Sequence, residues 1–146
     1  MPVPANENRP ATARAEAPPL RIARLSHLVA TVAFAAMTMI VGHRIGGSLV
    51  GDVVGGAAAA LVVAGTWRRL VLSGGRVSFP GAGVAGLAAV LAAVLAIALT
   101  GRGVAPEAGD PGAVSTALFA FVVVAPLGVA LALALAALTR FLAARP

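Results

Sequence analysis

Residues 82–100 read AGVAGLAAVLAAVLAIALT, a stretch without any ionisable side chain. A helix needs about 20 mostly apolar residues to cross the roughly 30 Å hydrocarbon layer of a bilayer, so this stretch is close to the required length. Three more stretches of the same kind lie around it, at about residues 25–42, 48–66 and 113–139. The sequence therefore predicts an all-α integral membrane protein with four transmembrane helices.

The composition also favours a lipid environment. Of the 146 residues 60% are hydrophobic and only 11% are charged, and the mean hydropathy is +0.97. This apolar share exceeds that of an ordinary soluble domain, and four crossings use most of the chain, so we expect no separate soluble domain. The net charge of +6 would suit nucleic acid, but aromatic residues make up only 4% and tyrosine is absent, so we exclude that partner. Cysteine is absent too, and the sequence predicts no cofactor and no metal site.

The arginines divide unequally between the two sides of the predicted membrane domain. All eleven basic residues are arginines, and short loops retain arginine on the cytoplasmic side. When the segments are assigned alternately to the two sides, the other side holds Arg44 and Arg102, and the arginine-rich side holds Arg9, Arg14, Arg21, Arg24, Arg68, Arg69, Arg76, Arg140 and Arg145. This division predicts an antiparallel bundle in a bacterial inner membrane, with both termini in the cytoplasm.

The start of the chain differs from the rest. Residues 1–21 hold five of the ten prolines and almost no large apolar side chain. Such a segment cannot bury enough surface to offset the entropy of ordering, so we predict a disordered cytoplasmic tail before a transmembrane domain at residues 22–146. Cleavage of a signal peptide at residues 33–35 is disfavoured because the apolar run before them is too short. Cleavage after the whole first helix stays open, since it leaves the remaining arginine pattern unchanged.

A row of small residues follows the first apolar stretch, namely Gly47, Gly51, Gly55 and Ala59. Residues four apart stack on one side of a helix, and small side chains let helix backbones approach closely in a membrane, where van der Waals packing drives association. The row predicts a helix-packing surface on the second helix. Its partner is another helix of this chain or a second protein, and we favour the internal partner.

A cluster of ionisable residues, His43, Arg44 and Asp52, overlaps this row. Asp52 is the only acidic residue inside the four apolar stretches, and a carboxylate within a membrane is by default a functional hypothesis. If the second helix begins near Ser48, Asp52 lies about 6 Å from its start, where water can reach it. The structural interpretation pairs Asp52 with Arg44 at the positive end of the helix dipole. The alternative is a proton or ligand site formed by all three residues.

Two further positions predict local features of the second and fourth helices. Trp67, Arg68 and Arg69 follow the second stretch, a pattern typical of an interfacial aromatic anchor beside arginines that meet lipid phosphates. Pro126 lies near the middle of the fourth stretch and predicts a kink, because its ring removes a backbone donor and crowds the preceding turn.

The sequence assigns no catalytic residue, and three functional hypotheses follow. The first is a non-catalytic subunit or accessory partner of a membrane complex, because packing residues dominate the chain. The second is a small oligomeric exporter or proton-coupled permease that uses Asp52. The third is an integral-membrane enzyme acting on a lipidic substrate, with His43 and Asp52 as acid and base, but no nucleophile or second buried carboxylate accompanies them. The expected partners are the lipid bilayer and either another membrane protein or further copies of the chain.

Overall fold

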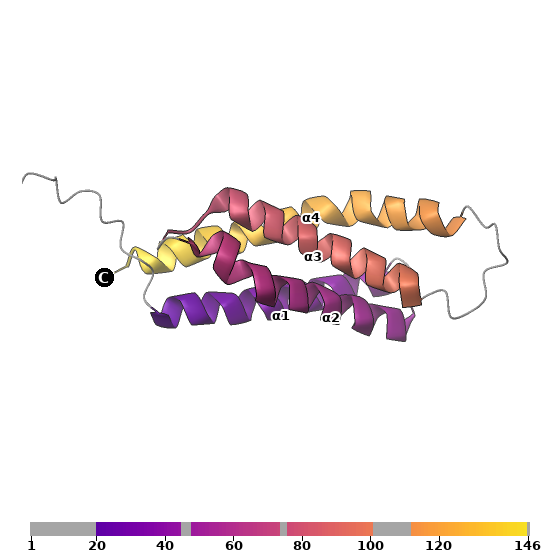
Figure 1. The fold of residues 1–146 in the computed structure, drawn as a ribbon, viewed down its shortest axis with the longest axis horizontal. Coiled ribbons are helices and arrows are strands. Elements are labelled where there is room, and N and C mark those ends of the chain that lie inside the picture. Colours follow the sequence, from indigo (N-terminus) through magenta and orange to yellow (C-terminus); the bar gives the residue numbers. More distant parts are fainter. Residues whose placement is uncertain (1–19, 45–47, 74–75, 101–111, 146) are drawn as a thin grey trace, which may run out of the picture.

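A computed structural model of the chain describes residues 20–44, 48–73, 76–100 and 112–145, with the backbone alone for residues 112–117 and 119. The elements in this part are α1 (Leu20–Arg44), α2 (Leu49–Thr66), the π-helical turn η2 (Trp67–Val71), α3 (Phe79–Thr100) and α4 (Gly112–Ala143). The four α-helices lie along the long axis of the molecule (Figure 1). The predicted all-helical class is confirmed.

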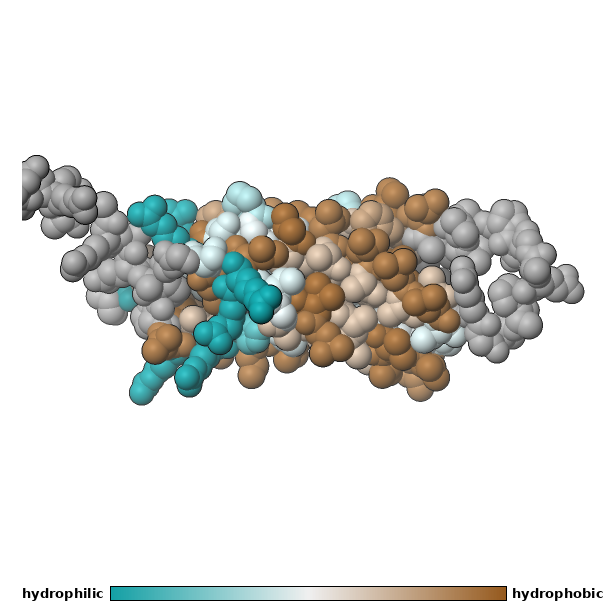
Figure 2. Space-filling view, in the orientation of Figure 1, coloured by the Kyte–Doolittle hydropathy of each residue, from teal (hydrophilic) through white to brown (hydrophobic). Residues whose placement is uncertain are grey.

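Four helical segments are long and apolar enough to cross a membrane, namely Leu20–Arg44, Leu49–Val71, Phe79–Thr100 and Ala120–Ala143. Large apolar side chains cover the middle of the outer surface, and hydrophilic residues gather toward one end (Figure 2). A continuous apolar exterior of this kind suits lipid better than water. The four spans indicate a multi-pass membrane protein.

The helices extend beyond the apolar stretches. The first helix, α1, begins at Leu20 and not near residue 25, so it includes Arg21 and Arg24, whose side chains are exposed. Arginine is a good helix former, and its charge ends an apolar stretch without ending a helix. Residues 1–19, which make up most of the predicted tail, lie outside the described residues.

Serine side chains cap the starts of two helices. Ser48 has extended backbone angles, and its Oγ accepts a hydrogen bond from the Gly51 N–H at 3.1 Å. Ser78 Oγ accepts from the Gly81 N–H at the same distance, at the start of α3. Each bond satisfies an N–H group that has no partner within the first helical turn. Both starts are therefore determined locally by the sequence.

The second helix, α2, packs between α1 and α3, and α3 packs in turn against α4. Contacts between α1 and α4 close the bundle. The fully buried large side chains are Trp67, Phe34, Val63, Val71 and Val90, and most other core residues are alanines. Small interior side chains let the helix backbones lie close together, which is how helices gain contact energy in an apolar solvent.

Glycines of α2 face both of its neighbours. A β-carbon on Gly55 would lie 2.7 Å from the Ile97 side chain of α3, and a β-carbon on Gly56 would lie 2.7 Å from Met39 Cγ of α1. The remaining members of the row of small residues are Gly51 and Ala59, which are buried, and Gly47, which lies outside the described residues. The closest approaches of α2 therefore depend on the absence of side chains on two sides.

Another close approach, between α3 and α4, involves glycines that the sequence analysis did not pair. A β-carbon on Gly86 would lie 2.7 Å from the Gly128 carbonyl oxygen, and a β-carbon on Gly128 would overlap Val90. Pro126 lies two residues before Gly128, within the continuous helix α4. The kink at Pro126 stays a prediction.

Candidate functional site

Asp52 lies in the first turn of α2 and is the only ionisable side chain that is buried among the described residues. Its exposed fraction is 3%, and its Oδ1 atom is buried without a hydrogen-bond partner. The expectation that water reaches Asp52 was wrong. It counted depth along the helix axis and ignored the neighbouring helices that cover the side chain.

The covering comes from α1 and α3. A β-carbon on Gly42, near the end of α1, would lie 2.5 Å from Asp52 Oδ1 and 3.8 Å from Ile97 Cδ1 of α3. Ile97 also lies beside Gly51 and Gly55 of α2. Asp52 thus lies where the end of α1, the start of α2 and the end of α3 meet, and Gly42 leaves the room for its carboxylate.

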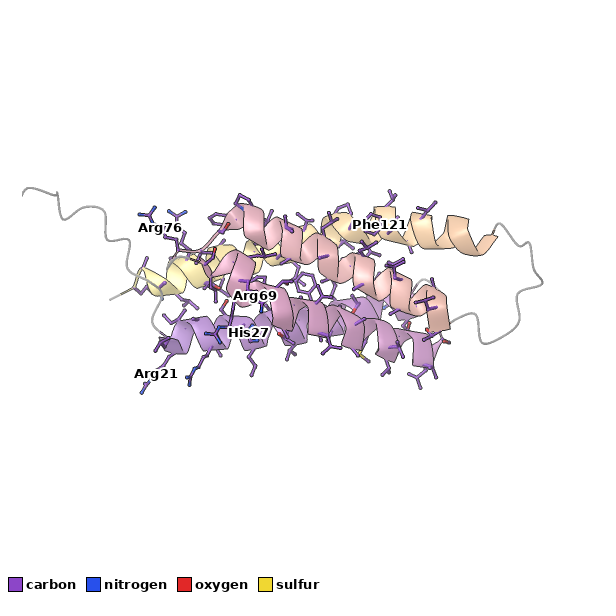
Figure 3. All side chains as sticks on the ribbon, in the orientation of Figure 1. Arg21, His27, Arg69, Arg76 and Phe121 are labelled. Atoms are coloured by element: carbon purple, nitrogen blue, oxygen red, sulfur yellow. The ribbon has the colours of Figure 1, made fainter. Side chains whose placement is uncertain are left out.

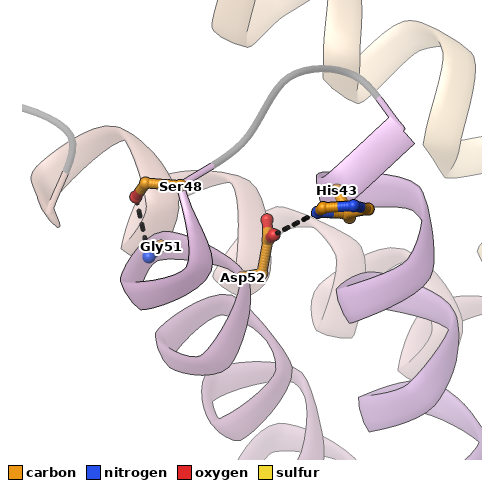
Figure 4. A network of polar contacts seen from close by, with 4 residues as sticks. All are labelled: His43, Ser48, Gly51 and Asp52. Atoms are coloured by element: carbon orange, nitrogen blue, oxygen red, sulfur yellow. Dashed lines mark hydrogen bonds and ion pairs between the residues drawn. The ribbon is translucent and has the colours of Figure 1, made fainter.

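The ionisable neighbour of Asp52 is His43, not Arg44. His43 Nδ1 lies 3.7 Å from Asp52 Oδ2 (Figure 4). This distance exceeds that of a hydrogen bond, and the His43 side chain is 77% exposed, so the contact is a loose ion pair that exists when the imidazole is protonated. In the part of the chain that the structure describes, Arg44 makes no ion pair with Asp52, so the predicted pairing was wrong. Consecutive helical residues point about 100° apart, which turns Arg44 away.

Ser48 is not positioned as a nucleophile for this pair. Its Oγ accepts from the Gly51 N–H and lies on the far side of Asp52 from His43 (Figure 4). A catalytic serine needs a hydrogen bond to its general base. The structure brings His43 and Asp52 together, as the enzyme hypothesis requires, but the described residues place no nucleophile beside them.

A second buried polar group, which we call the Trp67 network, lies at the opposite end of the bundle. Trp67 Nε1 donates to Ser26 Oγ at 3.0 Å, and Ser26 Oγ lies 2.7 Å from Thr139 Oγ1. Thr139 donates its proton to the Leu135 carbonyl oxygen at 2.7 Å, so Ser26 must donate to Thr139. Each donor in this network has an acceptor, and together they join α1, η2 and α4.

The Trp67 side chain lies inside the protein, which corrects its predicted role as an interfacial anchor. Its exposed fraction is 0%. Tryptophan prefers the depth of the membrane interface. This preference does not say whether the side chain faces lipid or protein, because a helix at that depth still has one side against the other helices. Arg68 and Arg69, the next two residues, are exposed, and their contact with lipid phosphates stays a prediction.

Positive charge accompanies the Trp67 network. Figure 3 shows Arg21, Arg69, Arg76 and His27 at this end of the molecule. The exposed arginines on the segments that meet here are Arg21, Arg24, Arg68, Arg69, Arg76, Arg140 and Arg145. Nδ1 of His27 is buried without a hydrogen-bond partner, but the ring itself is only half-buried. The two ends of the bundle therefore differ in charge: arginines surround one, and Asp52 is buried at the other.

Among the described residues, no three His, Cys, Asp or Glu side chains lie close enough together to hold a metal ion. Glu107 and Asp110, in the connection between α3 and α4, lie outside the described residues.

No protein-family model, curated protein or solved structure matches the chain significantly.

Proposed function

We propose that the chain is a non-catalytic subunit or accessory partner of a membrane complex. The observation that carries this proposal is the small number of reactive side chains in the interior. Among the described residues, Asp52 alone is both ionisable and buried. Enzymatic sites need several converging groups, such as a nucleophile, a base and a stabilising donor. The rest of the interior consists mainly of alanine and valine, which contribute packing.

In the membrane, the proposed arrangement is an antiparallel four-helix bundle with both termini in the cytoplasm. The arginines at the end of the Trp67 network support it, because arginine is retained on the cytoplasmic side of bacterial inner membranes. A reporter enzyme that works only in the cytoplasm should be active when it is fused after Pro146, and one that works only outside the cytoplasm should be inactive there. The opposite result would mean that the C-terminus lies on the outer side of the membrane.

Purification in mild detergent tests the subunit proposal. The full chain, tagged at either end, should retain a second membrane protein at fixed stoichiometry by native mass spectrometry, and tagging that protein should recover this chain. An unrelated four-helix membrane protein at matched expression is the control. If the chain purifies without another protein, as a monomer or as a homo-oligomer, the proposal is wrong.

A second function, a small oligomeric exporter or proton-coupled permease, is favoured by one observation, the unpartnered Oδ1 of Asp52. Ionisable groups inside transporters mark proton and ion pathways. In liposomes with an entrapped pH-sensitive dye, Asp52→Asn should abolish any proton flux that the wild-type protein shows. Equal flux through the variant would exclude a role for Asp52 in transport.

A further inference from the structure

Basic side chains of α1 and η2 gather on one face at the arginine-rich end of the bundle. Arg21, Arg24 and His27 follow one another at intervals of three residues, so they lie along one side of α1. Figure 3 shows Arg21, His27 and Arg69 of η2 on the viewed side of the molecule, and Figure 2 shows a band of hydrophilic residues across the same face. We call the exposed Arg21, Arg24 and Arg69 the basic face.

The Trp67 network fixes the two elements that carry the basic face. The hydrogen bond from Trp67 Nε1 to Ser26 Oγ joins η2 to α1, two residues before Arg69 and two residues after Arg24. The π-helical turn is itself hydrogen-bonded, since the Leu72 N–H donates to the Trp67 carbonyl oxygen at 3.2 Å, five residues earlier. The arginine side chains are exposed, but the backbone segments that carry them are held by buried contacts.

No acidic residue near the basic face balances its charge within the part of the chain that the structure describes. The first turn of α1 and the η2 turn contain none. Asp52, the one acidic residue in that part, lies at the opposite end of the bundle. Guanidinium groups on one face repel one another, so an anion that contacts more than one of them is favoured there. Phosphate suits this position, because guanidinium binds it through paired N–H donors.

The surface beside the basic face is apolar. Leu28 and Val32 follow Arg24 at intervals of four residues, so they continue the same side of α1 into the span, and both are exposed. A ligand with a phosphate and a hydrocarbon chain can contact both regions, whereas free phosphate contacts the arginines alone. A zwitterionic headgroup also carries an ammonium group, which the arginines repel. The surface therefore favours a lipid whose headgroup has a net negative charge.

We propose that the basic face binds an anionic phospholipid, with the phosphate at Arg24 and Arg69 and an acyl chain along Leu28 and Val32. Basic pockets between transmembrane helices bind anionic headgroups in this way. The binding does not depend on the subunit proposal, since it is a property of the isolated chain. It gives the lipid contact predicted for Arg69 a second contributor, α1.

Native mass spectrometry of the full chain in a neutral detergent tests the proposal. Phosphatidylglycerol and phosphatidylcholine with the same acyl chains are titrated separately, and the fraction of the chain that carries one lipid gives each Kd. We expect phosphatidylglycerol to bind at least about tenfold more tightly, because each arginine near an anionic lipid contributes roughly fivefold in affinity. Inorganic phosphate in excess over phosphatidylglycerol should not displace it, since phosphate lacks the acyl chain.

Two double variants locate the binding. Arg24→Gln with Arg69→Gln should weaken phosphatidylglycerol binding at least about tenfold and leave phosphatidylcholine binding unchanged. Arg140→Gln with Arg145→Gln is the matched control, because it removes the same charge from exposed arginines of α4 and the residues after it. The guanidinium groups of these two arginines lie over aromatic rings of the chain, 5.8 and 4.3 Å from the ring centroids. The control should bind phosphatidylglycerol as the wild type does.

Three results would overturn the proposal. Equal wild-type affinities for the two lipids would show that the headgroup charge is not recognised, and displacement by inorganic phosphate would indicate a site for soluble phosphate. An equal loss in both double variants would mean that the affinity comes from the total charge of this end. If circular dichroism shows that the Arg24 and Arg69 double variant is unfolded, the single variants replace it. Each should then weaken phosphatidylglycerol binding about fivefold, and unchanged binding in both rejects the proposal.

Discussion

The two ends of the bundle treat buried polar groups in opposite ways. At one end, the Trp67 network joins three elements, and each of its donors has an acceptor. At the other end, three helices also meet, but Asp52 Oδ1 has no partner, and His43 approaches the carboxylate at 3.7 Å. Packing covers both sites equally well, so burial does not distinguish them.

This difference separates buried polar groups that stabilise the fold from a buried polar group that is available for a function. A fully satisfied network rigidifies the structure and has no valence left for a ligand. An unsatisfied carboxylate costs stability and persists where it serves some other purpose. We therefore expect substitutions in the Trp67 network to lower the free energy of unfolding more than substitutions of Asp52 do.

The largest effect should come from Trp67→Ala. Large-to-small substitution of a buried tryptophan costs about 3–5 kcal/mol of unfolding free energy, and the lower part of this range applies here because lipid solvates apolar groups as well as protein does. Circular dichroism during an SDS titration measures the loss, since the variant lacks its fluorophore. The control is Leu61→Ala, whose side chain is 74% exposed and faces outward. Equal losses in the two variants would show that Trp67 is not a core residue.

Gly42→Ala tests the packing at the Asp52 end. Its β-carbon would lie 2.5 Å from Oδ1, and overpacking of this kind costs about 1–3 kcal/mol. Gly65→Ala is the matched control, because nothing lies within 4 Å of a β-carbon there. The same SDS titration compares them. A Gly42→Ala protein as stable as the control would mean that α1 does not cover Asp52.

Ser26→Ala should have a smaller effect, because it removes the central hydroxyl of the Trp67 network but leaves the packing in place. Hydrogen bonds within membrane proteins contribute about 0.6 kcal/mol on average and up to about 1.7 kcal/mol. The loss should appear in the unfolding free energy and should be shared with Trp67→Phe, so that the double variant loses less than the sum. Additive losses would show that the two side chains do not interact.

Asp52→Asn should change the unfolding free energy least, by less than about 1 kcal/mol, and in the stabilising direction. Asparagine has nearly the same shape, and its neutral amide avoids the desolvation cost of a buried charge. The SDS titration again decides. A loss above about 2 kcal/mol would mean that the carboxylate is a paired structural group.

Hydropathy was enough to predict the four spans, because it depends on local composition. Apart from the row of small residues on the second helix, the sequence did not indicate which side of each helix faces inward. In a soluble helix the polar side marks the exterior, but here the lipid-facing and buried sides are both apolar. Trp67 illustrates the consequence: the residue type indicates a depth, and only the neighbouring helices determine that it points inward.

The candidate site was predictable in its central residue and not in its surroundings. A lone carboxylate in an apolar stretch identified Asp52, whereas the choice between His43 and Arg44 depends on how α1 is rotated about its axis. Gly42 could not be recognised as its close neighbour for the same reason. Gly81 is a similar case, since a β-carbon there would overlap the Leu70 carbonyl oxygen of η2.

The hydrogen bond between Ser26 and Thr139 connects residues 113 positions apart, so the ribosome synthesises the two partners at different times. At an elongation rate of about 5–20 residues per second, the ribosome adds Thr139 about 6 to 23 s after Ser26. The first two helices can leave the translocon as a hairpin long before their last partner exists. A nascent chain stalled before Thr139 would therefore expose the Ser26 hydroxyl to whatever insertase or quality-control protease attends its emergence.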